Sequence, residues 1–150
     1  MSTSLTTAQE LLAVLPLFNR IMAVELRQET GDDTTMPQFR VLSYLADEPM
    51  TMSAIARLRH VSFQSAGELV QALVERGWVQ RTPDPTDRRQ SLLNLTDAGR
   101  AQYERAQNHM LERLASFMDQ LDENEQTTIQ QALQSLHRVL VQEVVKEDDN

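Results

Sequence analysis

The residues best placed to do chemistry lie in the segment DPTDRRQSLLNL, which covers positions 84–95. It places Asp84, Asp87, Arg88 and Arg89 close together in sequence. A guanidinium group suits bidentate contact with a phosphate or a base edge, whereas two arginines on a loop are more often plain solvated surface. The two carboxylates could in principle serve acid–base chemistry. The surrounding elements must decide between these alternatives.

Catalytic and metal sites find little support in the residue types and their spacing. No Ser-His-Asp set, P-loop or metal-binding spacing accompanies Asp84 and Asp87, so a hydrolase is a weak hypothesis. His60, His109 and His137 lie far apart and show no i, i+3 or i+4 pairing. The chain has no cysteine, which excludes disulfides, thiolate zinc sites and thiol redox sensing. We therefore expect no enzyme, no cofactor and no metal site.

The arginines are expected near the tip of a β-hairpin. The runs WVQRTP (78–83) and SLLNL (91–95) are strand-like, and Asp84-Pro85 marks a turn between them. Thr96 then caps a long helix that is predicted to reach about Leu121.

Two helices are predicted just before the hairpin, over residues 53–60 and from Ser62 to Arg76. Ser62 is a good N-cap, and Gly77 is a natural residue to follow a helix end. The second helix has an apolar stripe formed by Ala66, Leu69, Val70, Leu73 and Val74, and an opposite polar face formed by Gln64, Glu68, Gln71 and Glu75. Two helices joined by a short turn match a helix-turn-helix, and the hairpin that follows would be its wing.

Long helices are predicted at both ends of the chain. Residues 7–29 carry apolar side chains at spacings of three and four, and Pro16 should kink this segment or mark a helix start. A shorter helix over 36–48 follows. Asp122 and Glu125 have capping-box spacing for a last helix, whose apolar seam comprises Ile129, Leu133, Leu136, Leu140 and Val144. So long a seam needs a partner surface. Only the tail 146–150 looks disordered.

The composition is that of one domain with a polarised charge. The chain has 150 residues and a net charge of −8. Residues 51–100 hold seven basic and five acidic side chains, a net of +2, so the other hundred residues carry −10. An acidic field repels nucleic acid, but the centre is mildly basic. The N-terminus lacks a basic region, and the apolar stretch 11–18 is too short to span a bilayer, which predicts a cytoplasmic protein.

This order of elements, with TMSAIARLRHVS and RGWVQRTPDPTDRRQSLLNLTDAGR, resembles the MarR family of bacterial transcription regulators. The resemblance covers nearly the whole chain and is most specific at residues 76–100. It implies a mainly α fold with a small β-hairpin wing, in which residues 35–96 form a winged helix-turn-helix. It also implies a homodimer that pairs through a helical region, residues 1–34 and 97–150. Such a dimer binds a near-palindromic operator as a repressor, and a small ligand, often aromatic or anionic, relieves repression.

The family's second helix reads the major groove, where side chains distinguish all base pairs. Gln64 and Gln71 could each engage adenine, and Glu68 could accept from cytosine N4 although it repels phosphate. Ser62 and Ser65 lie where phosphate contact is expected. Phe63 is either partly buried or in contact with a thymine methyl.

The resemblance also assigns roles in the wing. Its tip is thin enough for the minor groove, whose negative potential attracts arginine, so Arg88 is the expected groove contact. Arg89 is expected to pair with Asp87 or another acid and to hold the wing in shape.

A ligand would have to contact the junction between the dimer helices and the winged region, because it acts only through differential affinity for two states. The candidates there are Phe18, Met22, Arg40 and Tyr44, with a structural ion pair as the alternative role for Arg40. An alternative function is a winged-helix module that binds a protein or ligand and has lost specific DNA binding. Glu68 and the negative net charge motivate it.

Overall fold

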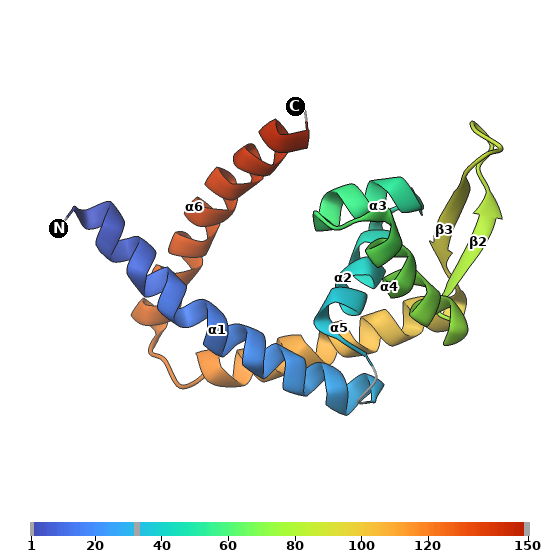
Figure 1. Ribbon diagram of the computed structural model, residues 1–150. Coiled ribbons are helices and arrows are strands. Elements are labelled where there is room, and N and C mark those ends of the chain that lie inside the picture. The colour runs from blue at the N-terminus through green and yellow to red at the C-terminus, as the bar shows by residue number, and fades with distance from the viewer. Residues whose placement is uncertain (1, 32–33, 149–150) are drawn as a thin grey trace. The chain divides into compact units, whose positions relative to one another are not determined.

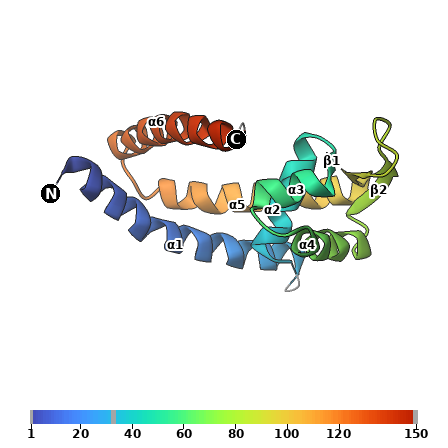
Figure 2. The ribbon, with the colours of Figure 1, turned by 45° about the horizontal axis from the view of Figure 1, so that its top comes forward.

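The structure is a computed structural model that describes residues 2–31 and 34–148 (Figure 1 and Figure 2). Within these ranges the chain is mainly helical with one small sheet. The elements are α1 (Thr3–Thr30), α2 (Met36–Asp47), β1 (Met50–Thr51), α3 (Met52–Arg59), α4 (Phe63–Glu75), β2 (Val79–Pro83), β3 (Ser91–Leu95), α5 (Asp97–Met118) and α6 (Glu123–Asp148). Residues up to Leu111 form one compact unit and residues from Glu112 form another, so the boundary lies within α5.

The predicted hairpin is confirmed and belongs to a three-stranded antiparallel sheet with the order β1-β3-β2. In the hairpin, Val79 pairs with Leu95 and Pro83 pairs with Ser91. β1 lies on the other edge of β3, with Met50 opposite Leu93. β1 was not predicted, because two residues are too few to show the alternation that identifies a strand.

We call the winged helix-turn-helix, residues 35–96, the winged unit. Its core is built by α2, α3, α4 and the sheet. Its buried members include Val41, Leu42, Leu45, Ile55, Ala66, Val70, Leu73, Val79 and Leu93. The predicted apolar stripe of α4 is confirmed, because its members are buried or half-buried while the polar face is exposed. Burial of each large side chain contributes about 1.5–3 kcal/mol. This packing fixes which face of α4 is turned to solvent.

Two tight turns set the direction of the chain on either side of α4. Gly77 has φ 76°, and the N–H groups of Gly77 and Trp78 donate to Val74 O at 2.9 Å and Leu73 O at 3.0 Å. This is a Schellman motif, as expected for a glycine just past a helix end. His60 ends α3 in the same conformation with φ 50°, which costs a non-glycine residue about 1–2 kcal/mol.

The N-terminus of α5 rests on the base of the hairpin. The Thr96 hydroxyl caps the helix by accepting from Gly99 N–H at 3.0 Å, and it donates to Gly77 O at 2.5 Å. A Cβ on Gly99 would lie 2.0 Å from the carbonyl oxygen of Trp78, so only glycine permits this approach. The end of the wing is thereby fixed to the start of a long helix.

A second cluster joins α1, α2 and α5 within the first unit. Leu26, Phe39, Ala106 and Met110 are buried in it. Polar contacts lie beside the cluster: His109 Nε2 is 2.7 Å from Glu25 Oε2, and Arg105 Nε is 3.7 Å from Glu29 Oε1.

Pro16 lies inside α1, which begins at Thr3. The alternative that Pro16 marks a helix start was therefore wrong.

Arg76 ties the end of α4 to the chain that follows α1. Its guanidinium donates to the Thr34 hydroxyl and lies 4.7 Å from the centre of the Trp78 ring. Thr34 is buried. The helix-turn-helix is thus anchored at its C-terminal end by the side chain of the residue that directly follows its second helix.

The second unit comprises the end of α5 and α6. The predicted capping box is confirmed, because Asp122 N–H donates to Glu125 Oε2 at 3.0 Å and Glu125 N–H donates to Asp122 Oδ1 at 2.9 Å. The seam residues Leu133, Leu140 and Val144 are 53–59% exposed. Lys146 continues α6 although disorder was predicted there, and residues 149–150 lie outside the described residues.

Across the described ranges, we find no helix with both the length and the hydropathy that crossing a bilayer requires.

Candidate nucleic-acid interface

The exposed face of α4 presents the side chains of Gln64, Glu68 and Gln71. Ser62 caps the helix, because its Oγ accepts from Ser65 N–H at 3.1 Å. The Ser62 hydroxyl also donates to Ser65 Oγ at 3.0 Å, which leaves the Ser65 hydroxyl hydrogen to seek another acceptor. A capped helix N-terminus with spare donors suits an anion.

Phe63 is 63% exposed and therefore does not belong to the core. It lines a cavity of about 250 Å³ with the apolar side chains of Met52 and Leu93, and with Arg81 and Arg89 from the hairpin. This exposure contradicts the partly buried role predicted for Phe63, and its contact with a thymine methyl stays a prediction.

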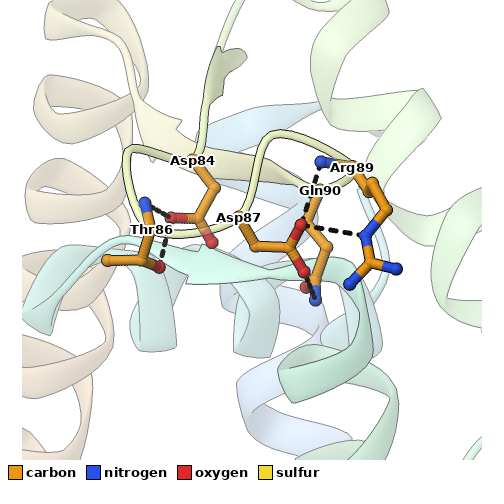
Figure 3. Close-up of polar contacts among 5 residues, drawn as sticks. All are labelled: Asp84, Thr86, Asp87, Arg89 and Gln90. Carbon is orange, nitrogen blue, oxygen red and sulfur yellow. Dashed lines mark hydrogen bonds and ion pairs between the residues drawn. The ribbon is translucent and has the colours of Figure 1, made fainter.

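The wing loop is shaped first by Asp84, whose carboxylate lies against the loop itself (Figure 3). Oδ1 accepts from the Thr86 backbone N–H at 2.9 Å and from the Thr86 hydroxyl at 2.8 Å. The backbone and then the side-chain hydrogen bond from Thr86 lower the pKa of Asp84 below its ordinary value. Asp84 N–H also donates to Gln90 O at 3.2 Å, which closes the neck of the loop.

Asp87 holds the other half of the loop (Figure 3). Its Oδ1 accepts from the Arg89 N–H at 3.1 Å and from Arg89 Nε at 3.2 Å, and Oδ2 accepts from Gln90 Nε2 at 3.3 Å. The backbone hydrogen bond and then the guanidinium of Arg89 lower the pKa of Asp87. The Arg89 side chain is 91% exposed, so this ion pair orients the loop more than it stabilises the fold.

Arg88 differs from its neighbour because it is exposed and makes no hydrogen bond or ion pair with any residue that the structure describes. Its guanidinium is therefore available at the hairpin tip, where the neighbouring carboxylates of Asp84 and Asp87 already accept hydrogen bonds from the loop.

Gln71 has partners that the sequence did not indicate. Arg81 Nη2 on β2 donates to Gln71 Oε1 at 3.0 Å, and Gln71 Nε2 donates to Glu75 Oε1 at 3.3 Å. The spacing of Gln71 and Glu75 on one helix face allows the second contact. The first depends on how the hairpin packs against α4, and no local pattern in the sequence reports that.

The residues weighed for other chemistries are dispersed or engaged. Both Asp84 and Asp87 accept hydrogen bonds that shape the loop. Over the ranges that the structure describes, no three or more histidine and carboxylate side chains gather as metal ligands.

The ligand candidates occupy different environments. Met22 packs against the cluster around Leu26, Phe18 is 42% exposed, Arg40 is exposed and Tyr44 is half-buried. A shared ligand site for them stays a prediction.

Comparison with known proteins agrees with this architecture. A model of the MarR family matches residues 32–90. The transcriptional regulator AdcR of Streptococcus pneumoniae is 30% identical over 105 residues, which cover 68% of this chain and 72% of that protein. A putative transcriptional regulatory protein for the hcr operon of Thauera aromatica is 28% identical over 110 residues, 73% of this chain and 66%, slightly under two thirds, of that protein.

Solved structures share the fold over most of the chain. RV1404 from Mycobacterium tuberculosis has a TM-score of 0.83 and 27% identity, covering 93% of this chain and 95% of that one. FabT from Streptococcus pneumoniae, solved in complex with DNA, has a TM-score of 0.75 and 19% identity over 93% of this chain and 98% of that one. By its helix-turn-helix, its wing and these matches, the chain belongs to the MarR family of winged-helix transcriptional regulators.

Proposed function

We propose that the protein is a homodimeric repressor that binds a near-palindromic double-stranded DNA operator. The observation that carries the proposal is an exposed polar face on α4 beside a hairpin whose tip presents Arg88 from a hydrogen-bonded loop. An α-helix fits the major groove, and an arginine suits the negative potential of a narrow minor groove. FabT, which has the same fold, was solved with DNA, and this supports DNA as the partner.

Each side chain has a proposed role in the complex. Gln64 and Gln71 read base edges, and Glu68 accepts from a cytosine amino group. Ser62, Phe63 and Ser65, at the start of α4, contact phosphate or a thymine methyl. Arg88 enters the minor groove, while Asp87 and Arg89 keep the loop in shape.

The dimer is proposed to form through residues 1–34 and 97–150, leaving residues 35–96 to bind DNA. α1 exposes Leu12, Leu15 and Phe18, and α6 exposes an apolar seam of its own, which a second copy would cover. Two reading helices on one side of the duplex need half-sites about 10 bp apart, centre to centre.

Relief by a small aromatic or anionic ligand is proposed at the junction that includes Phe18, Met22, Arg40 and Tyr44. Met22, on α1, packs against the buried cluster to which α1, α2 and α5 all contribute. A ligand there would act on the winged unit through α2.

The test begins with duplexes that the wild-type protein selects from a randomised DNA library. Arg88→Ala is expected to lower affinity for the selected duplex on the order of tenfold and to reduce the salt slope by about one. Its melting temperature should stay near wild type because the side chain is exposed. Arg138→Ala on α6 removes the same charge from another exposed position and should bind normally. An Arg88→Ala protein that binds like wild type would contradict the role of the wing.

One observation favours a second candidate function, a winged-helix module that binds a protein or ligand without reading DNA. The Glu68 carboxylate stands exposed in the middle of the reading face, where it repels phosphate, and the whole chain carries −8. A wild-type protein that enriches no sequence from the library, even at low salt, would favour this alternative.

A further inference from the structure

The amide of Gln71 lies between two charged side chains of opposite sign. Arg81, on β2 of the wing, donates from Nη2 to the Gln71 amide oxygen at 3.0 Å. The Gln71 amide nitrogen donates to Glu75 Oε1, one turn further along α4, at 3.3 Å. All three side chains are exposed. The contact between Arg81 and Gln71 therefore links the wing to the polar face of the reading helix at the surface.

The chemistry of the two partners fixes which way the amide points. An arginine can only donate hydrogen bonds, so the amide oxygen must face Arg81. An ionised glutamate can only accept, so the amide nitrogen must face Glu75. Rotating the amide by half a turn would place donor against donor and acceptor against acceptor. A glutamine without such partners would populate both orientations.

Each partner uses only half of the amide. The oxygen keeps a second lone pair and the nitrogen keeps a second hydrogen. Adenine offers the complementary pair in the major groove, an N6 donor beside an N7 acceptor. A glutamine whose amide is already oriented loses less conformational freedom when it binds such an edge.

We propose that Arg81 is a positioning residue that presets the amide of Gln71 and so sets the preference for adenine at one base pair of each half-site. The proposal rests on the proposed DNA-binding function. In this proposal the wing has a second role, because β2, the strand that leads to Arg88 at the hairpin tip, also orients the Gln71 side chain of α4. The competing role for Arg81 is a direct phosphate contact, which carries no base preference.

The test uses the full-length protein and the duplex selected from the randomised library. The Gln71→Ala variant first identifies the base pair whose preference depends on Gln71. Arg81→Met and Glu75→Met are then measured on duplexes that carry adenine or guanine at that base pair. These two variants change the net charge in opposite directions. A general electrostatic effect would therefore weaken DNA binding by Arg81→Met and strengthen DNA binding by Glu75→Met. Circular dichroism confirms that each variant is folded.

Both variants are expected to lose the adenine preference at that base pair, by about tenfold relative to wild type. In the Gln71→Ala background neither substitution should change the preference further. Arg57→Met, which removes an equal charge from an exposed position on α3, should keep it.

Three results would overturn the proposal while leaving the repressor function intact. Arg81→Met could weaken binding equally on both duplexes and reduce the salt slope by about 0.9, which is the signature of a phosphate contact. Glu75→Met could keep the full preference. Gln71→Ala could change no base preference at all. A wild-type protein that selects no sequence would instead overturn the proposed function itself.

Discussion

Arg88 and Arg89 are adjacent and identical in type, but the loop separates their roles. Arg89 donates to Asp87 through its backbone N–H and its side chain, whereas Arg88 makes no polar contact among the described residues. A rigid loop that leaves one guanidinium available lowers the entropic cost of placing that group in a groove. Gln64 and Gln71 differ in a similar way, because among the described residues Gln71 has hydrogen-bond partners on both sides of its amide and Gln64 has none.

The wing loop should resist acid until its carboxylates protonate. Hydrogen bonds lower the pKa values of Asp84 and Asp87 in the folded loop. Their contribution to stability is therefore complete above the ordinary aspartate pKa of about 3.9 and is lost as pH falls through the lowered values. Carboxyl ¹³C shifts should show both groups titrating below the same groups in an unstructured peptide of residues 82–92. Equal midpoints in protein and peptide would mean that these hydrogen bonds are absent in solution.

At the scale of elements, the helix-turn-helix depends on how its helices end. α4 begins at a serine cap and ends in a Schellman motif at Gly77, and α3 ends with His60 in the left-handed region. α5 then starts directly on the hairpin base, through Thr96 and Gly99. Hydrogen bonds therefore fix the position of the wing where it follows α4, at Gly77, and where it leads into α5, at Thr96.

Gly99→Ala is expected to destabilise the protein even though alanine is the better helix former. Its Cβ would lie 2.0 Å from the Trp78 carbonyl oxygen, so either α5 or the backbone just before β2 must shift. Overpacking of this kind costs about 1–3 kcal/mol. Gly67→Ala on α4 is the matched control, because its Cβ would meet nothing within 4 Å, and it should stabilise by about 1 kcal/mol. Chemical denaturation measures both, and equal effects for the two variants would refute the close approach.

At the scale of the whole molecule, the distribution of charge and of apolar surface matters more than the totals. The chain has a net charge of −8, but residues 51–100, which include α3, α4 and the wing, have a net charge of +2. Among the described residues, most of the large apolar side chains left exposed lie on α1 and α6, outside the core of the winged unit. Both distributions are consistent with a dimer that turns its least acidic surface toward DNA.

The seam of α6 should control assembly. Leu133→Glu and Leu140→Glu place charges on side chains that are 59% and 53% exposed in the single chain. We expect each variant to shift the protein from dimer to monomer in sedimentation velocity, and to weaken operator binding with it. Gln131→Glu, on the opposite side of the same helix, should leave the dimer intact. A wild-type protein that sediments as a monomer would contradict the proposed pairing.

The sequence by itself determined the features that depend on neighbouring residues. The stripe and polar face of α4, the bounds of β3, the Gly77 helix end and the Asp122–Glu125 capping box all follow from periodicity or from local hydrogen bonding. The resemblance added the family. These features are predictable because the interacting atoms lie within a few positions of one another.

Only the tertiary structure decided which distant residues meet. It paired the two residues of β1 with β3, pressed Gly99 against Trp78, and brought Arg81 to Gln71 and His109 to Glu25. No repeating pattern in the sequence predicts these contacts, because each depends on the angle at which whole helices and strands pack. That angle is set by the summed burial of many core side chains rather than by the two residues that come into contact.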